Sequence, residues 1–209
     1  MRKVCELGRS MVEMLGVLAI IGVLSVGGIA GYSKAMEKYK LNKQAEQLSH
    51  LLNLVYRHKA SWGKNPPYMN LMPYFKAMGE IPEDMIKDDS DYIYGAFNGK
   101  IGISTNGCSP FCNYINVAYH LGGNDNFELC KNVLSVAKEF HDQLWSIMAY
   151  GRANTEENYT SNGYRYGDRY CKSSRNCIRN MTLEDMNTEC KYCAEHETCT
   201  FNLQYKIID

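Results

Sequence analysis

An uncharged apolar segment close to the start of the chain limits what this protein can fold into more than any other feature. Residues 14–33 form a continuous stretch without a charged side chain, in a chain of 209 residues. As an α-helix this stretch is about 30 Å long, which is the thickness of the hydrocarbon core of a bilayer. One carboxylate, Glu13, stands where the apolar run begins. The segment therefore predicts a single membrane-spanning helix with a charged group at its start.

Two common kinds of segment compete with a specialised role for this helix. A secretory signal peptide has a shorter apolar core, and Glu13 is out of place in one. A plain signal anchor would leave Glu13 near the lipid headgroups, whereas a carboxylate inside the membrane is costly and suggests a function. Basic residues flank the segment on both sides, so charge does not predict its orientation. Eight of the nine cysteines follow the segment, which indicates that its C-terminal side faces an oxidising compartment.

The composition of the chain narrows the class of protein. There are 23 Lys and Arg against 23 Asp and Glu, and this balance argues against a generally basic nucleic-acid-binding protein. With 45% hydrophobic and 22% charged residues, the chain has the composition of a folded protein. It contains no His-Glu-x-x-His, Gly-x-Ser-x-Gly or P-loop motif, and its five histidines are scattered. We expect neither an enzymatic activity nor a cofactor.

The residues around the start of the apolar segment carry a family resemblance. The run from Gly8 to Leu24, GRSMVEMLGVLAIIGVL, is similar to the leader junction of type IV pilins and pseudopilins. That family has a short basic leader ending in glycine, a cleavage site directly after it, a glutamate at the fifth mature position and an apolar helix. Counted from Arg9, Glu13 is fifth. The family usually has Phe, Met, Leu or Val at the first mature position, where this chain has Arg9.

The resemblance implies roles for these residues and a set of partners. A prepilin peptidase would cut between Gly8 and Arg9, Arg9 would become the N-methylated first residue, and Glu13 would act in assembly. Cleavage would remove Cys5 and leave eight cysteines. The implied partners are identical or related pilin subunits, the peptidase, an assembly ATPase and a polytopic platform protein. The implied location is the inner membrane, as a single-pass protein, before assembly and an extracellular or periplasmic filament afterwards.

The predicted helix continues well beyond the apolar segment. From Leu41 to Trp62 apolar side chains recur at steps of three and four residues, and basic side chains occupy the other face. Gly63 and the prolines that follow it close the segment, so one helix is predicted over residues 10–62. On the resemblance the chain divides into four parts: a leader peptide at 1–8, a transmembrane or filament-core half-helix at 9–33, an amphipathic half-helix at 34–64, and a globular α+β pilin domain with a cysteine-rich end at 65–209.

Charge is spread unevenly between the last two parts. Residues 33–64 hold seven basic and two acidic side chains, whereas residues 65–209 hold 13 basic and 19 acidic ones. Complementary surfaces on neighbouring subunits would use this polarity, and a solvated helix face accounts for it equally well.

The globular part begins with a loop and continues as a β-meander. Residues 66–91 are predicted as a loop with short helical pieces. Two β-type runs, 92–97 and 100–105, are joined by Asn98-Gly99, which is the strongest short hairpin signal. A third run at 113–121 extends the meander. The resulting fold class is α+β, with a long N-terminal helix packed on an antiparallel sheet, as in the type IV pilin fold that the resemblance implies.

The rest of the chain combines a helix, a polar region and a final strand. Apolar residues from Phe127 to Leu144 trace a helical face, and residues 145–150 are either the end of that helix or a new strand. Residues 151–198 are polar and rich in Asn, Tyr and Cys, and residues 200–208 are typical of a strand. An acidic cluster at Asp88–Asp91 is a calcium site on the resemblance to pseudopilins, or a solvated turn because its ligand spacing is not ordered.

The cysteines predict a disulfide framework. Beyond an exported N-terminus we expect all eight to pair, although their connectivity does not follow from the sequence. They are Cys108, Cys112, Cys130, Cys171, Cys177, Cys190, Cys193 and Cys199. The last five could instead form a zinc cluster or contain a redox pair. The order of elements resembles type IVb pilins, in which a helix cysteine is bridged to one near the C-terminus, and on that resemblance Cys130 pairs with Cys190, Cys193 or Cys199.

These observations lead to one interpretation with two alternatives. We interpret the chain as a prepilin, a structural subunit of a type IV pilus or pilus-like filament that is processed after Gly8 and assembled through its N-terminal helix. Within the family, the alternative is a pseudopilin or minor tip pilin of a type II secretion or DNA-uptake machine. From a different class, the alternative is a membrane-anchored, disulfide-rich binding domain that never polymerises.

Overall fold

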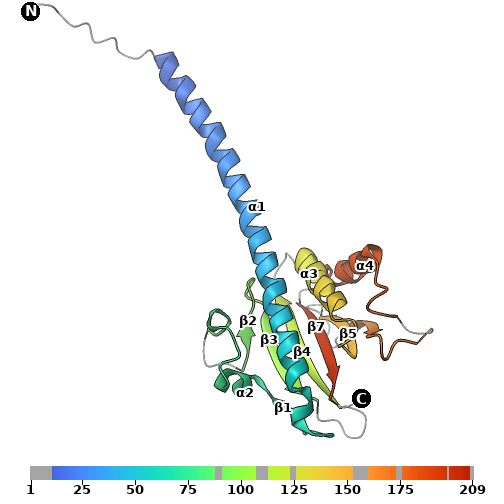
Figure 1. Ribbon diagram of the computed structural model, residues 1–209. Coiled ribbons are helices and arrows are strands. Elements are labelled where there is room, and N and C mark those ends of the chain that lie inside the picture. The colour runs from blue at the N-terminus through green and yellow to red at the C-terminus, as the bar shows by residue number, and fades with distance from the viewer. Residues whose placement is uncertain are drawn as a thin grey trace, which may run out of the picture. The chain divides into compact units, whose positions relative to one another are not determined.

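The computed structural model shows an α+β protein with a long N-terminal helix and an antiparallel sheet (Figure 1). The protein also contains disulfide bonds. It describes residues 11–87, 91–106, 113–122, 126–152, 160–172, 176–196 and 198–207. The chain divides into two compact units, Met1–Lys40 and Leu41–Asp209.

The N-terminal helix extends as far as the sequence predicted. Helix α1 runs over Met11–His58 and is followed by a 3-10 turn, Lys59–Trp62. The turn ends at Gly63, whose φ of 71° lies in the left-handed region that favours glycine. The 48 residues of α1 contain no proline, so nothing in the sequence interrupts its backbone hydrogen bonds.

Short elements connect α1 to the sheet, as expected for residues 66–91. They are strand β1 (Met69–Asn70), helix α2 (Met72–Ala77) and a 3-10 turn (Glu83–Met85). The Asn70 side chain accepts a hydrogen bond of 3.0 Å from the backbone N–H of Met72 and so satisfies one donor at the start of α2. Met72, Phe75 and Met85 are fully buried, which fixes this connection against the core.

The sheet contains seven antiparallel strands among the described residues, in the order β1-β3-β4-β7-β5-β6, and β2 also pairs with β3. The remaining strands are β2 (Ile93–Tyr94), β3 (Lys100–Thr105), β4 (Tyr114–Gly122), β5 (Ser146–Arg152), β6 (Thr160–Tyr166) and β7 (Thr198–Lys206). The last strand of the chain therefore lies in the middle of the sheet, between β4 and β5 (Figure 1).

One face of this sheet carries the core of the second unit. On β4 and β7 alternate residues such as Val117, Tyr119, Phe201 and Leu203 are fully buried, because successive side chains of a strand point to opposite faces. The C-terminal half of α1 and the helices α3 (Asn126–Glu139) and α4 (Leu183–Ala194) supply the apolar side chains that cover this face. The residues in between, on the opposite face, are mostly polar.

The Asn-Gly hairpin forms, but its first strand is shorter than predicted. Of residues 92–97 only Ile93 and Tyr94 pair with β3, opposite Ile101 and Lys100. The next residues make the turn instead, since the N–H of Asn98 donates to the carbonyl of Gly95 at 2.9 Å. Asn98 takes the left-handed conformation, with a φ of 60°.

Glycine at position 99 is required by a neighbouring strand and not by its backbone angles. A Cβ atom there would lie 2.8 Å from the His120 carbonyl oxygen and 2.9 Å from the Tyr119 ring. A Cβ at Gly95 would lie 2.7 Å from the Tyr119 hydroxyl. The two glycines thus let the hairpin turn pack closely against β4.

The structure resolves one alternative and contains two elements that the sequence reasoning did not predict. Residues 145–150 belong mainly to a strand, β5, and not to the end of α3. Strand β6 and helix α4 lie within residues 151–198, which were described only as polar. Helix α4 does have a sequence signal: Thr182 and Asp185 form a capping box, a motif that marks a helix start.

Candidate assembly site on the N-terminal helix

The first half of α1 is apolar on all sides and exposed on all sides. Leu15, Leu18, Val23 and Leu24 are 66, 61, 74 and 69% exposed. Because successive residues are turned by about 100° around a helix, these side chains together cover its whole circumference. A helix of this kind needs lipid or other protein to cover it. It is the one helix among the described residues that is long and apolar enough to cross a membrane.

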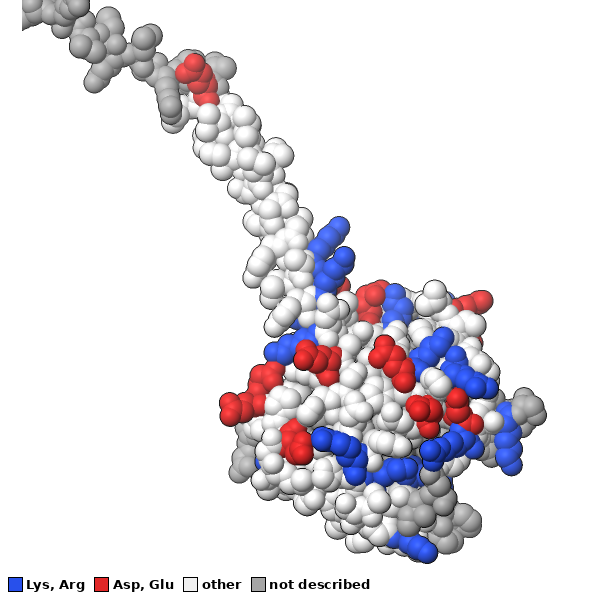
Figure 2. Space-filling model, viewed as in Figure 1, with Lys and Arg blue, Asp and Glu red and all other residues white. Residues whose placement is uncertain are grey.

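Glu13 lies in the first turn of this helix. The free N–H groups at a helix start carry a partial positive charge, so a carboxylate is favourable there. Residues 14–33, which follow it, carry no charge, and Figure 2 shows that stretch of α1 as a surface of uncharged side chains. Glu13 is therefore the single charged side chain of the described apolar segment.

Among the described residues, nothing packs closely on the glycines of the apolar half. A Cβ atom built at Gly16, Gly22, Gly27, Gly28 or Gly31 would meet no heavy atom within 4 Å. Each glycine costs a helix about 1 kcal/mol relative to alanine. Small residues let a neighbouring helix approach closely, which is a common reason for glycine in apolar helices.

The second half of α1 contributes side chains to the hydrophobic core. Leu48, Leu51, Leu52, Leu54 and Val55 are at most 1% exposed. These residues recur at the three- and four-residue steps that the sequence indicated for the amphipathic half. This part of α1 is therefore fixed by burial, in contrast to the apolar half.

A buried polar network fixes the register of this half-helix. Gln44 is 1% exposed, and its side-chain amide donates to the Tyr119 hydroxyl on β4 at 3.0 Å. The Asn132 side chain on α3 donates to the Gln44 side-chain oxygen and to the Leu41 carbonyl, each at 2.8 Å. Burial raises the pKa of Tyr119 to about 12, although the hydrogen bond from Gln44 acts in the opposite direction. A slip of α1 would break all three contacts.

Part of the basic face of α1 is neutralised within the chain. Lys43 lies 2.6 Å from Asp84, and Arg57 lies 3.2 Å from Glu80. The hydrogen bond from Lys43 holds the pKa of Asp84 below its ordinary value. The Gln47 side chain donates to Asp84 and accepts from a backbone N–H. At these positions the opposite charges of α1 and of the globular part of the chain, called the head below, attract each other within one molecule.

Three disulfides lie among the described residues of the C-terminal half. Cys130 on α3 is bonded to Cys190 on α4, which is one of the three partners that the resemblance implied. Cys193, near the end of α4, is bonded to Cys199 at the start of β7. A third bond closes a short loop between Cys171 and Cys177. Because each of these six sulfurs is bonded to another, none of them is a thiolate ligand for zinc.

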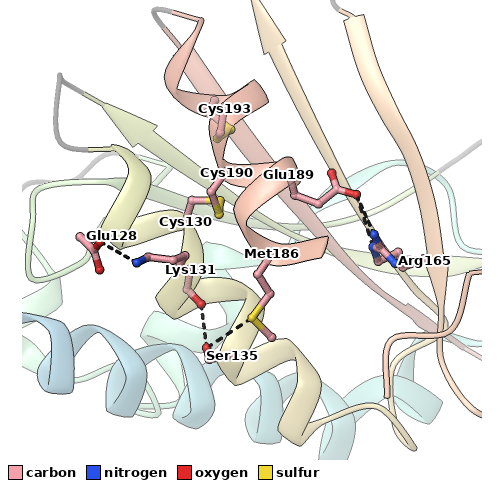
Figure 3. The surroundings of a disulfide bond; sticks show 10 residues. Glu128, Cys130, Lys131, Ser135, Arg165, Met186, Glu189, Cys190 and Cys193 are labelled. Carbon is pink, nitrogen blue, oxygen red and sulfur yellow. Dashed lines mark hydrogen bonds and ion pairs between the residues drawn. A yellow bond between two sulfur atoms is a disulfide. The ribbon is translucent and has the colours of Figure 1, made fainter. Parts of the chain in front are cut away.

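The bridge between α3 and α4 lies among further contacts of the two helices (Figure 3). Ser135 on α3 donates to the Lys131 carbonyl and lies 4.0 Å from the Met186 sulfur on α4. On the other side of α4, Arg165 of β6 pairs with Asp185 at 3.4 Å and with Glu189 at 3.3 Å. Helix α4 is thus held between α3 and the edge strand β6.

Several predicted sites lie outside the described residues. They are the cleavage residues Gly8 and Arg9, the cysteines Cys108 and Cys112, and most of the acidic cluster, Asp88–Ser90. Cleavage, methylation, calcium binding and the fourth disulfide therefore stay predictions. Among the residues that the structure does describe, no group of three or more His, Cys, Asp or Glu side chains is arranged to hold a metal ion.

A scan of protein-family models and searches of curated proteins and of solved structures returned no match to this chain.

Proposed function

We propose that this chain is a prepilin, which is processed after Gly8 and polymerises through its N-terminal helix into a pilus or pilus-like filament. The observation that carries the proposal is the first half of α1, which is exposed, apolar on all sides and has one carboxylate at its start. The same helix continues as a wall of a disulfide-bonded α+β head. A subunit of this design has one part that needs covering and one part that is already folded.

The covering of the helix explains how one segment serves two states. In the membrane, lipid tails cover the apolar side chains of a single-pass subunit. In a filament, the same helices from neighbouring subunits cover one another, and their glycines allow close approach. When the subunit passes from the membrane into the filament, protein replaces lipid around the apolar helix, and the head is unchanged.

Glu13 supplies the specificity that apolar packing lacks. Apolar helices alone can slide past each other, whereas a lone carboxylate in an apolar bundle costs several kcal/mol unless a positive partner is present. The amino terminus that cleavage creates on a neighbouring subunit is such a partner. The Arg9 side chain would add a second positive charge beside it. The pair would set the axial position of each new subunit.

The proposal includes the partners and location of such a subunit. A prepilin peptidase cuts the leader, and an assembly ATPase and a platform protein move the subunit from the inner membrane into the filament. The filament is extracellular or periplasmic. Within the described part of the chain, one helix is long and apolar enough to span a membrane, and it is compatible with this location before assembly.

Processing is tested by sequencing the N-terminus of the mature protein from cell membranes. We expect it to start at Arg9, and Gly8→Ala to accumulate the precursor because the residue before the cut is changed. A mature protein that starts at Met1, or near Gly31 as after signal-peptide cleavage, would refute the proposal.

Assembly is tested by Glu13→Ala, with Glu37→Ala as the matched control. Glu37 is an exposed carboxylate on the same helix, beyond the apolar stretch. Loss of one partner of a buried ion pair costs about 3–5 kcal/mol, so Glu13→Ala should reduce sheared filaments at least tenfold. Membrane insertion, cleavage and disulfides should be unchanged.

Immunogold labelling of sheared filaments supplies the readout and separates the alternatives. Labelling along the filament supports a major subunit, and labelling at the tip alone supports a minor pilin. A labelled cell surface without filaments would support the anchored binding domain and refute polymerisation. Equal loss from Glu13→Ala and Glu37→Ala would show that Glu13 has no particular role.

A further inference from the structure

The polar face of the sheet, opposite the helices, has a row of side chains across four strands. Lys100 on β3 lies opposite His120 on β4, His120 lies opposite Thr200 on β7, and Thr200 lies opposite Tyr150 on β5. The four strands are neighbours in the sheet (Figure 1). With a spacing of about 4.8 Å between strands, the row is about 14 Å long.

This row lines a recess in the sheet surface. In the next row along the strands stand Gly102, Ala118, Asn202 and Met148. The Tyr92 ring lies over Gly102, where a Cβ atom would meet it at 3.3 Å. Asn202 and Met148 line the recess together with the four residues of the first row. Its volume is about 810 Å³, within the range of about 300–1,000 Å³ that is typical of small-molecule sites.

Two polar side chains of the recess, His120 and Asn202, are each held in place by one hydrogen bond. His120 Nδ1 and Thr200 Oγ1 lie 2.8 Å apart, and Thr200 is only 4% exposed. The Asn202 side-chain oxygen accepts from Asn116 at 3.0 Å. The Nε2 atom of His120 and the amide nitrogen of Asn202 have no hydrogen-bond partner within the described parts of the chain.

The recess carries one positive charge and no described negative one. Lys100 is exposed, and its ammonium group lies 5.9 Å from the centre of the Tyr92 ring. No Asp or Glu is among the described residues that line the recess. Burial, together with the charge of Lys100, holds the pKa of His120 below its ordinary value. At neutral pH the imidazole is therefore uncharged, and with Nδ1 bonded to Thr200 its Nε2 atom is left as a single donor or acceptor for a ligand.

The geometry points to a binding site for a carboxylate-bearing sugar residue of a glycan, with Lys100 on the carboxylate and His120 and Asn202 on the sugar hydroxyls. A pyranose ring has hydroxyl groups at its edge and C–H groups on its faces. The imidazole and amide suit the hydroxyls, and Met148 with the Tyr150 ring suits a C–H face. The ammonium group adds an ion pair with the carboxylate, which a neutral sugar cannot form. This site is independent of filament assembly, and its failure would leave that proposal standing.

The test is a binding titration with the full chain in polyoxyethylene detergent micelles, which contain no sugar. The probes are 3′-sialyllactose, glucuronic acid and neutral lactose, and their binding is measured by saturation-transfer NMR. We expect both acidic sugars to bind at least about tenfold more tightly than lactose, because only they engage Lys100. Salt should weaken the acidic sugars and leave lactose unchanged.

Variants locate the site without disturbing the core. Lys100→Met removes an exposed charge and should reduce the affinity for sialyllactose about tenfold, to that for lactose. Lys206→Met is the matched control, since Lys206, on β7, also lies over an aromatic ring, that of Trp145, but does not line the recess. Thr198→Trp, at an exposed position of the recess, should block all three sugars.

Four results would overturn the inference. They are absence of binding by both acidic sugars, equal affinity of Lys100→Met and the unaltered chain, competition by acetate as strong as by glucuronic acid, and tighter binding of a short peptide with a free C-terminal carboxylate. The last two would indicate a general carboxylate site or a peptide site. Retained sialyllactose affinity in Lys206→Met, with its loss in Lys100→Met and Thr198→Trp, would support it.

Discussion

The three described disulfides allow a quantitative test of how this head is stabilised. Cys130 and Cys190 are 60 residues apart, whereas Cys193 and Cys199 are 6 apart, and all four residues are fully buried. In the chain-entropy model, a bridge stabilises by a constant of about 0.6 kcal/mol plus 1.5RT ln n, where n is the length of the closed loop. A tenfold difference in n is worth about 2 kcal/mol at 25 °C. When both cysteines of a bridge are replaced by alanine, the loss of loop closure should therefore cost about 4 kcal/mol for the long loop and about 2 kcal/mol for the short one.

Burial does not confound this comparison. Removing a buried sulfur atom leaves a small cavity, and that cost is shared by the two buried bridges. The bridge between Cys171 and Cys177 also spans 6 residues, but its cysteines are half-buried. The difference in lost unfolding free energy between the two short bridges therefore measures the effect of burial. The same difference between the two buried bridges measures the effect of loop length.

The assay is urea unfolding of the full chain in nonionic micelles, followed by tryptophan fluorescence, with free energies from linear extrapolation. Non-reducing mass spectrometry of each double variant would show that the other bridges are intact. If the two buried bridges cost the same within about 0.5 kcal/mol, loop closure would not be the source of their stabilisation. A larger loss from the half-buried short bridge than from the long one would refute the reasoning as well.

Two further predictions concern buried tyrosines. Tyr119→Phe should lower the free energy of unfolding by about 1–3 kcal/mol, because this change leaves the buried Gln44 amide without its acceptor. Tyr205→Phe should leave the free energy of unfolding unchanged or raise it, since the buried Tyr205 hydroxyl has no partner among the described residues. The same urea assay measures both, and an equal loss would contradict the network. Alkaline pH should also destabilise the head. Burial raises the pKa of Tyr119 to about 12, so the unfolded chain ionises first, and stability present below pH 10 is lost as the pH rises from about 10 to about 12. The melting temperature should fall less steeply with pH across that range in Tyr119→Phe than in the unaltered chain. An unchanged slope would exclude this hydroxyl as a cause.

Local patterns in the sequence determined much of the first half of the fold. The uncharged run and the three- and four-residue spacing of apolar residues predicted a helix over 10–62, which α1 and its 3-10 turn occupy. Asn98-Gly99 predicted the hairpin, although the turn takes residues from its first strand. These features follow from the helix and strand periodicities and from turn chemistry, which depend on neighbours in the chain.

The second half depended more on contacts between distant residues. Residues 151–198 are polar enough to resemble a loop, yet β6 and α4 form there. Strand β6 is stabilised by pairing with β5, and α4 by its bridge to α3 and its ion pairs with Arg165. Helix α4 has a capping box that a reading of the sequence alone could have used.

The candidate assembly segment was visible in the sequence because it is defined by what it lacks, namely any charge over residues 14–33. The pairing of the cysteines and the recess on the sheet were decided by tertiary structure. Strand β7 inserts between β4 and β5 and brings Thr200 beside His120, which is distant from it in the chain. Strand order results from the total burial and hydrogen bonding of all strands together, so no local pattern contains it. The sequence by itself determined the long helix, and the packing of the whole head decided which side chains meet on its sheet.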